Sequence, residues 1–386
     1  MSRIYGAIVG PRPKPVAGGL RIALVADGRP GDRHTNSGVA LGMLEALRAD
    51  PGVASVLPID ASFHGPLKAL VALRAAKASL KAWRINYSHG RFAIRARSRA
   101  VRRQVERHQD DIDLVLLIRG IYQPFDFPYA IFIDSTVALT RRFWPQLAVR
   151  DVDHAASTSD DQAQLSSALR VFTAGRHVAE HVVVDYGIPR DRVSAIGGGL
   201  NYSLSDIGER TPSPQPTILF VGHDFERKGG DLLCEAFGRV RGAIPDARLL
   251  LAGRGTHAAH RQPGLTVLGD VDDRHALSEL YRTATVFCLP ARFEPFGLVL
   301  LEAMAHGLPC VATNVGEIPQ ILQDGNLGVI VPAEDVAGLA DALIGLLRDP
   351  ERQKVLSERS RREVEANGTW NLVARRLLER LPADLK

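Results

Sequence analysis

Two glutamates in the C-terminal half of the chain, Glu294 and Glu302, are separated by seven residues. The apolar residues 285–289 predict a strand before the first glutamate, and the composition of residues 298–305 predicts a helix. Glu294 would then lie in a loop at the carboxyl end of a strand, and Glu302 in the helix that follows. Ligands of open α/β sheets bind at the carboxyl ends of strands, so both carboxylates can face one crevice. The competing interpretation is two solvated acids near a turn.

The residues around both glutamates carry a family resemblance. They read Glu294-Pro-Phe-Gly-Leu, Glu302-Ala-Met-Ala and Gly307-Leu-Pro-Cys-Val-Ala-Thr. This resembles the E-x7-E donor-site signature of the retaining, nucleotide-sugar-dependent glycosyltransferases of family 4. The resemblance covers Leu20 to Leu381 and is stronger in the C-terminal half. It implies a hexosyltransferase with the α/β fold GT-B, in which two Rossmann-like, doubly wound domains face each other across a cleft.

The resemblance also implies roles for individual residues. Lys228 matches the lysine that binds the donor phosphates, where a cation stabilises the charge that accumulates as the glycosidic bond breaks. Glu302 would bind the ribose hydroxyls and Glu294 the hydroxyls of the transferred sugar, and we expect Lys228 and Glu302 to be exposed in a cleft. The backbone N–H groups expected near the sugar belong to Phe296, Gly297 and Leu298.

Two positions depart from the family pattern. The family usually has an arginine after the glycine that corresponds to Gly222, and this chain has His223. Arg227 is the candidate replacement, although neighbours in a loop often point apart. Asp134 stands at a predicted strand end where many relatives have a histidine that contacts the donor sugar. It is a candidate for sugar contact or acceptor activation, and the alternative is a cap of the helix predicted from Val137.

The N-terminal half begins with a predicted strand at residues 21–27, a glycine-rich loop and a helix at residues 39–47. The resemblance implies that Ser37 and Gly38 in this loop approach the acceptor or the donor phosphates. The glycine spacing is not G-x-G-x-x-G, so a plain turn is an equal alternative.

The length and the strand–helix alternation predict two domains. The domain boundaries that we predict are a flexible arm at residues 1–18, an acceptor-side domain at 19–205, a linker at 206–216, a nucleotide-sugar-binding domain at 217–365, and a C-terminal helix at 366–386 that crosses back to the first domain.

Positive charge is concentrated in one segment, between Pro66 and His108. It contains one acid, Glu106, and twelve of the 48 lysines and arginines, whereas the chain has 43 acids in all, so the remainder is net acidic. Residues 66–82 and 91–108 predict two amphipathic helices with basic faces. Such faces can bind an anionic membrane surface, and the alternative is a merely solvated surface. The twelve cations are Lys68, Arg74, Lys77, Lys81, Arg84, Arg91, Arg95, Arg97, Arg99, Arg102, Arg103 and Arg107.

Metal, cofactor and membrane-spanning signals are weak or missing in the sequence. Cys234, Cys288 and Cys310 have no metal-like spacing and are expected to be reduced core residues. Asp151-Val-Asp153 is a faint match to the metal-binding pair of the other glycosyltransferase fold. We expect no metal or other cofactor, no nucleic-acid partner, and a cytoplasmic protein that is peripheral on the inner face of the cytoplasmic membrane if the basic helices bind it.

Three activities remain in competition. The first is hexosyl transfer from a nucleotide sugar to a glycan or lipid-linked acceptor, in cell-surface polysaccharide or glycolipid synthesis. The second is an epimerase with the GT-B fold, which needs further catalytic acids. The third is a sugar-nucleotide-binding protein without turnover, which the departures at His223 and Asp134 allow. The sequence does not distinguish UDP, GDP and ADP donors.

Overall fold

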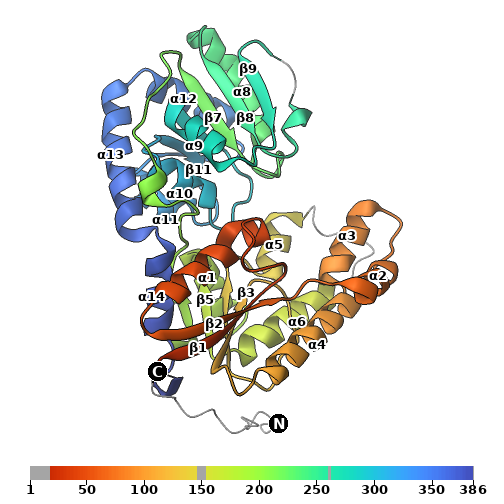
Figure 1. Ribbon diagram of the computed structural model, residues 1–386. Helices are drawn as coiled ribbons and strands as arrows, with labels where there is room; N and C mark the ends of the chain where they lie inside the picture. Colours follow the sequence, from red (N-terminus) through yellow and green to blue (C-terminus); the bar gives the residue numbers. More distant parts are fainter. Residues whose placement is uncertain (1–17, 146–153, 260–261, 386) are drawn as a thin grey trace. The chain divides into compact units, whose positions relative to one another are not determined.

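The computed structural model describes residues 18–145, 154–259 and 262–385 (Figure 1). It separates into unit 1, which comprises residues up to Gly197 and from Trp370 onward, and unit 2, Gly198–Thr369. The arm predicted at residues 1–18 lies outside the described residues except for Gly18. Residues 206–216, predicted as a linker, are grouped with unit 2. There Arg210 donates to the carbonyl oxygens of Gly307, at 3.1 Å, and Ala284, at 2.6 Å.

Unit 1 contains a six-stranded parallel sheet in the order β2-β1-β3-β4-β5-β6. Every residue of β3 and β4 is buried, as expected for parallel strands that are covered on both faces. The strands are β1 (Leu20–Ala26), β2 (Val53–Asp60), β3 (Leu114–Ile118), β4 (Tyr129–Ile133), β5 (Arg170–Thr173) and β6 (Val193–Ala195).

The helices of unit 1 include the last helix of the chain. Figure 1 shows α14 beside α1, and a Cβ at Gly42 would collide with the indole of Trp370, so the glycine makes room for this packing. The helices are α1 (Val39–Ala49), α2 (Gly65–Arg74), α3 (Leu80–His89), α4 (Arg91–Arg107), α5 (Val137–Phe143), α6 (His154–Ser167), α7 (Arg176–Val184) and α14 (Trp370–Glu379). Short 3-10 helices are η1 (Thr35–Gly38), η3 (Arg190–Arg192) and η7 (Ala383–Leu385).

Unit 2 contains a second six-stranded parallel sheet, in the order β12-β11-β10-β7-β8-β9. Its strands are β7 (Thr217–Val221), β8 (Arg248–Ala252), β9 (Leu265–Gly269), β10 (Val286–Leu289), β11 (Cys310–Thr313) and β12 (Val329–Val331). Its helices are α8 (Gly230–Ala243), α9 (Arg274–Thr283), α10 (Leu298–Ala305), α11 (Ile318–Ile321), α12 (Val336–Leu347) and α13 (Pro350–Asn367), with 3-10 helices η4 (Leu204–Asp206), η5 (Thr256–Ala258) and η6 (Gln323–Gly325). Cys288 and Cys310 are fully buried free thiols, whereas Cys234 is half-buried.

The basic segment differs from its prediction in two respects. The single helix predicted at residues 66–82 is two helices, because Ser79 starts α3 by accepting a hydrogen bond from the amide of Ala82 at 3.1 Å. Arg97, counted among the surface cations, is only 2% exposed. The ten others that can be described are exposed (Lys68, Arg74, Lys77, Arg84, Arg91, Arg95, Arg99, Arg102, Arg103 and Arg107).

Candidate active site

Each sheet has a topological switch point, where successive connections leave in opposite directions. In unit 2 the chain runs outward from β7 to β9 and then returns to β10, which pairs with β7. The switch point therefore lies between β7 and β10, and in unit 1 the same logic places it between β1 and β3. Ligands of open α/β sheets bind outside the carboxyl ends of the strands at such points. The topology therefore predicts a ligand site among the residues that follow β7 and β10.

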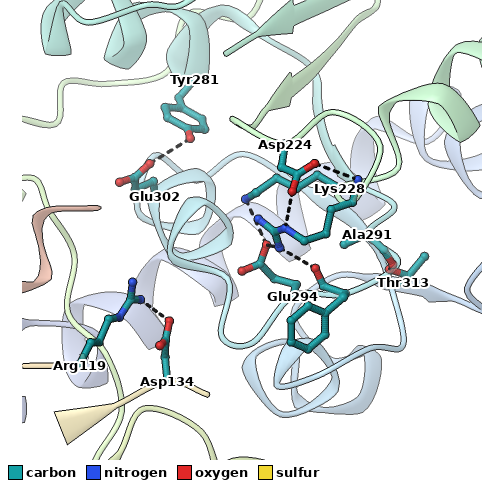
Figure 2. A network of polar contacts seen from close by, with 11 residues as sticks. Arg119, Asp134, Asp224, Lys228, Tyr281, Ala291, Glu294, Glu302 and Thr313 are labelled. Carbon is teal, nitrogen blue, oxygen red and sulfur yellow. Dashed lines mark hydrogen bonds and ion pairs between the residues drawn. The ribbon is translucent and has the colours of Figure 1, made fainter. Parts of the chain in front are cut away.

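Lys228 and Glu294 meet at the switch point of unit 2. Lys228 follows β7, Glu294 follows β10, and the lysine Nζ lies 3.1 Å from Oε2 of the glutamate (Figure 2). A guanidinium nitrogen of Arg227 lies 3.6 Å from the same oxygen. Lys228 and Glu294 are each only 8% exposed, which excludes the solvated-acid interpretation for Glu294 and corrects the expectation of an exposed lysine. The neighbours Arg227 and Lys228 do not point apart, since both reach one carboxylate.

The loops that carry these residues are fixed by polar contacts. Arg227 donates from Nε to Asp224 at 3.2 Å and from Nη1 to the carbonyl of Phe293 at 2.6 Å. A Cβ at Gly222 would collide with Cδ of Lys228, so the glycine at the end of β7 gives the lysine chain its path. These contacts preorganise two cations and one carboxylate with little side-chain freedom left to lose on binding.

Arg292 is a second anchor of the same loop. Its guanidinium bonds both carboxylate oxygens of Asp231, at 2.6 and 2.8 Å, and reaches Glu334 at 2.7 Å. These carboxylates hold the pKa of Arg292 above its usual value. Since its amide also donates to the carbonyl of Arg227 at 2.9 Å, Arg292 couples the β10 loop to the β7 loop.

Glu302 lies on α10 and is also only 8% exposed. The expectation that it would be exposed is therefore wrong. The hydroxyl of Tyr281 donates to its Oε2 at 3.1 Å (Figure 2). Burial raises the pKa of Glu302, and the Tyr281 hydrogen bond, the charge of Lys228 and the Asn201 side chain act in the opposite direction. Behind the carboxylate, the imidazole of His306 stacks on Tyr281 with 5.0 Å between ring centroids. Glu302 is thus a held carboxylate near Lys228.

The turn before α10 has the predicted residues in place. Gly297 precedes the helix with φ of +105°, a conformation that favours glycine. Protein atoms come no closer than 3.7 Å to a Cβ placed there, so the backbone conformation, rather than crowding within the protein, requires the glycine. Phe296 is buried, and Leu298 begins the helix.

His223 contacts a different carboxylate from the one that Lys228 contacts. Its imidazole is 62% exposed and lies 3.6 Å from Asp270, which also pairs with Arg254 at 3.2 Å. Partial burial and the charge of Arg254 lower the pKa of His223 below its usual value. A neutral imidazole does not supply the positive charge of the family arginine at neutral pH.

In unit 1, Asp134 follows β4 and forms an ion pair with Arg119, which follows β3 (Figure 2). Thr136, not Asp134, caps α5, by accepting a hydrogen bond from the amide of Leu139 at 3.1 Å, so the capping alternative is wrong. Arg119 has φ of +55°, an uncommon conformation for a side-chain-bearing residue, of the kind that collects at functional sites.

Ser37 and Gly38 lie where the first strand turns into α1. Asn36 and Ser37 have positive φ, and Gly38, which precedes α1, is also left-handed. The side-chain amide of Asn36 donates to the carbonyl of Ile118 at 3.2 Å. The loop is therefore tied to the end of β3. Asp151 and Asp153 lie outside the described residues. Residues 18–145, 154–259 and 262–385 contain no group of three His, Cys, Asp or Glu side chains placed to hold a metal ion.

Comparison with known proteins finds its family match in the second unit. Residues 215–349 match the family model described as glycosyl transferases group 1. The matched residues lie within unit 2. Phosphatidyl-myo-inositol mannosyltransferase of Mycobacterium leprae is 38% identical over 195 residues, 47% of this chain and 51% of the relative. Glycogen synthase of Mycobacterium tuberculosis is 28% identical over 265 residues, 66% of this chain and 63% of the relative. The matched part of the chain thus spans about half the length of the mannosyltransferase.

Solved structures extend the fold assignment to the whole chain. Sucrose-phosphate synthase from Thermosynechococcus elongatus superposes with a TM-score of 0.71 at 20% identity, over 93% of this chain and 98% of that chain. WaaG, a glycosyltransferase involved in lipopolysaccharide biosynthesis, gives 0.66 at 17% identity, over 94% and 100%. At these identities the likeness concerns the fold, which is GT-B. The resemblance to the family 4 glycosyltransferases is therefore confirmed for the fold and for the group 1 domain.

Several residues of these sites were not predicted from the sequence. Tyr281, Arg292 and Arg254 carry no local motif, and their importance depends on which carboxylate each one reaches. Arg119 had a usable signal, because an Arg-Gly pair directly follows a buried strand and so lies at the carboxyl edge of the sheet.

Proposed function

We propose that this protein is a retaining glycosyltransferase that moves a hexosyl unit from a nucleotide sugar to a glycan or lipid-linked acceptor. The observation that carries the proposal is the buried contact of Lys228 and Arg227 with Glu294 at the switch point of a group 1 domain. Cations and a carboxylate fixed side by side suit a ligand that has a diphosphate next to a polyhydroxyl sugar.

The chemistry follows from these groups. As the bond between the sugar C1 and the phosphate oxygen breaks, the electron pair stays on the nucleoside diphosphate, whose added charge Lys228 and Arg227 stabilise. Glu294 holds the sugar by accepting hydrogen bonds from its hydroxyls, and Glu302 holds the ribose. The acceptor oxygen bonds to C1 on the face that the phosphate leaves, and its proton passes to a phosphate oxygen, so the anomeric configuration is retained. In this proposal, protein cations balance the diphosphate without a metal ion.

The relatives support the two acceptor classes. One is named for mannosyl transfer to phosphatidyl-myo-inositol, a lipid, and the other for the synthesis of glycogen, a glycan. We propose that the product is a cell-surface polysaccharide or a glycolipid.

We further propose that the basic segment docks on an anionic membrane surface from the cytoplasmic side. Leu70, Leu73 and Leu80 on α2 and α3 are 44%, 74% and 64% exposed, next to the ten exposed cations. Exposed leucines among cations suit a surface that is apolar below and anionic above. The described residues include no helix that meets the length and hydropathy of a membrane span.

Vesicle binding tests the docking proposal. Each cation near an anionic bilayer contributes about 1 kcal/mol, so reversing Arg95, Arg99, Arg102 and Arg103 to Glu should release the protein from phosphatidylserine vesicles. The control reverses Arg352, Lys354 and Arg359, exposed cations on α13. Equal partition onto neutral and anionic vesicles would contradict docking by charge.

Donor binding tests the transferase proposal. We expect one of UDP-, GDP- or ADP-hexoses to raise the melting temperature, since a ligand at 100 times its dissociation constant stabilises a protein by about 2.7 kcal/mol. Glu302→Gln should abolish the shift, and Glu235→Gln, an exposed glutamate of unit 2, should keep it. Binding in the Glu302 variant that equals the wild type would remove the donor-site assignment.

Turnover separates the remaining alternatives. Transfer to an acceptor, with chelator present and with retained configuration by NMR, is the expected result. An inverted linkage, or a requirement for metal, would contradict the corresponding part of the mechanism. Binding of the donor without transfer or hydrolysis would favour a binding protein.

A further inference from the structure

The switch point of unit 1 contains a polar cluster that no motif marks. Asp27 follows β1, Asp60 ends β2, and Tyr122 follows β3, so all three lie at the carboxyl edge of adjacent strands. Arg97 reaches Asp27 from α4, with Nη2 2.9 Å from Oδ2 of the carboxylate. This is the crevice position for a ligand in an open sheet, on the unit that contains the acceptor-side domain expected from the sequence.

Arg97 is buried and held by several contacts, whereas the Asp27 carboxylate is partly exposed. The arginine side chain is 3% exposed, donates to the carbonyl of Ser88 at 2.9 Å, and lies over the ring of Phe63, 5.0 Å from its centroid. The Asp27 side chain is 37% exposed, and its contact with Arg97 is made through Oδ2, not Oδ1. The pair therefore offers one carboxylate oxygen that is held at a fixed position and reachable from outside.

Two buried donors beside the acids also lack partners. The hydroxyl of Tyr122, a fully buried residue, and Nε of Arg97 have no hydrogen bond within the described part of the chain. The pKa of Tyr122 is raised, mainly by burial, and Asp27 and Asp60 raise it further while Arg97 lowers it, so all three charges lie near its hydroxyl. A buried polar group without a partner costs about 1–3 kcal/mol, and such a cost marks a place where a ligand or solvent completes the bonding.

We propose that this cluster is an acceptor subsite that recognises a neutral, polyhydroxyl group, such as the sugar or cyclitol ring that receives the hexosyl unit. Each hydroxyl both donates and accepts, so it suits a fixed carboxylate oxygen placed beside phenolic and guanidinium donors. The inference rests on the proposed function and adds the chemical class of the acceptor.

The charges of the cluster favour this class over ions. An anion would meet Asp27 and Asp60, while the guanidinium that could attract it is already paired with Asp27. Asp60 is occupied too, by the amide and hydroxyl of Ser62, at 2.8 and 2.6 Å, and by His64 at 3.1 Å. A phosphate-bearing acceptor can place its phosphate elsewhere, but the group that enters the cluster has no charge.

Saturation-transfer NMR on the full chain tests the subsite with named probes. The panel contains myo-inositol, methyl α-D-glucopyranoside and methyl α-D-mannopyranoside as neutral polyols, and inorganic phosphate as the anion. We expect at least one polyol to bind, and Asp27→Asn to weaken it by about tenfold or more. The matched control is Asp126→Asn, an exposed aspartate of the same unit, which should bind as the wild type does.

A second variant protects the test against loss of folding, because Asp27→Asn leaves a buried arginine unpaired. Tyr122→Phe removes a buried hydroxyl that has no partner within the described residues, so the variant should be at least as stable as the wild type. If Tyr122 is only structural, polyol binding is unchanged in this variant, whereas the subsite predicts polyol binding weakened severalfold. Three results would overturn the proposal. Polyol binding is equal in wild type and Tyr122→Phe, no polyol binds, or phosphate binds instead and is weakened by the same two substitutions.

The donor titration keeps the two proposals apart. If a nucleotide hexose binds through Glu302 and no polyol binds through Tyr122, only the acceptor subsite fails. If polyol binds and no donor does, the transferase assignment fails and the polyol site remains.

Discussion

The two units share one topology and place polar residues at the same point of it, but they build their sites in different ways. In unit 2 the switch point holds two cations and a carboxylate in direct contact, and Glu294 and Glu302 come from one short strand–loop–helix segment. In unit 1 the polar residues come from the ends of β1, β2 and β3 and from α4, and two of their donors have no partner within the described part of the chain. The comparison indicates that a local motif encodes the proposed donor site and that long-range packing encodes the proposed acceptor subsite.

Both units also hold a buried carboxylate with a tyrosine hydroxyl. In unit 2 Tyr281 donates to Glu302 at 3.1 Å, and in unit 1 Tyr186 donates to Asp161 at 2.8 Å. Asp161 also accepts from the amide of Val137 at 3.0 Å and so fixes the start of α5, just after Asp134. The same pairing therefore holds the carboxylate that we propose binds the donor in one unit, and a carboxylate that supports a helix start in the other.

The largest effect is expected from Lys228. Lys228→Gln should lower kcat/KM for the donor by about 10²–10³-fold, the cost of removing one preorganised charge-stabilising group. Lys354→Gln, which changes an exposed lysine of the same unit, should have no effect. Steady-state kinetics with the best donor of the panel measures both variants. A Lys228 variant with wild-type kcat/KM would mean that the cations at the switch point of unit 2 do not stabilise the leaving diphosphate.

Asp161 should make a large contribution to the pH dependence of the free energy of unfolding. Burial raises its pKa to about 6, above the usual 3.8. Because the folded state binds the proton more tightly, this carboxyl favours folding below its unfolded pKa, and that contribution is lost as the pH rises through about 6. Asp161→Asn, which can still accept both hydrogen bonds, removes this dependence. Its free energy of unfolding relative to wild type should therefore increase between pH 4 and 7, by up to about 3 kcal/mol.

Denaturant unfolding at a series of pH values measures this change. The same measurement on Asp126→Asn, which changes an exposed aspartate of the same unit, is the control. A flat difference for Asp161→Asn would show that the carboxyl titrates alike in the folded and unfolded states.

Tyr281→Phe should weaken donor binding, with an effect smaller than that of Lys228→Gln. Its hydroxyl lowers the pKa of Glu302, against the dominant effect of burial, so its removal raises that pKa further. Donor affinity should fall about fivefold, the worth of one hydrogen bond, and the loss of affinity in acid should begin at a higher pH. Donor titration against pH checks both. Tyr186→Phe, the matched change in unit 1, should leave donor affinity unchanged, and an equal loss in both variants would contradict separate roles.

The sequence predicted what depends on local order. The segment with Glu294, the turn at Gly297 and the helix with Glu302 could be placed because a strand, a turn and a helix follow one another within twenty residues. The break between α2 and α3 was missed because a single cap, Ser79, outweighed a continuous amphipathic pattern.

Arg97 shows what could have been predicted and what could not. It lies three residues after Ile94 and four before Val101, both buried, so helical periodicity places it on the inner face of α4. Its partner Asp27 is seventy residues away, and only the packing of α4 beside β1 brings the two together. The burial of Lys228 and Glu302 likewise depends on Tyr281 and the β10 loop, which no spacing within the motif describes.

The smallest expected effect concerns His223, the departure from the family pattern on the donor side. Partial burial and Arg254 lower its pKa below 6.5, so it carries no charge at neutral pH and gains one only as the pH falls. His223→Arg supplies a permanent cation at an exposed position, 62% exposed in the wild type, where an added charge contributes about 0.5–1 kcal/mol. We expect donor affinity at pH 7.5 to rise about two- to fivefold and to lose its gain in mild acid. Isothermal titration of the nucleoside diphosphate at pH 5.5 and 7.5 measures both, with His257→Arg on η5 as the control. An unchanged affinity at both values would show that His223 does not face the phosphates and that Arg227 and Lys228 alone form the cationic side of the donor site.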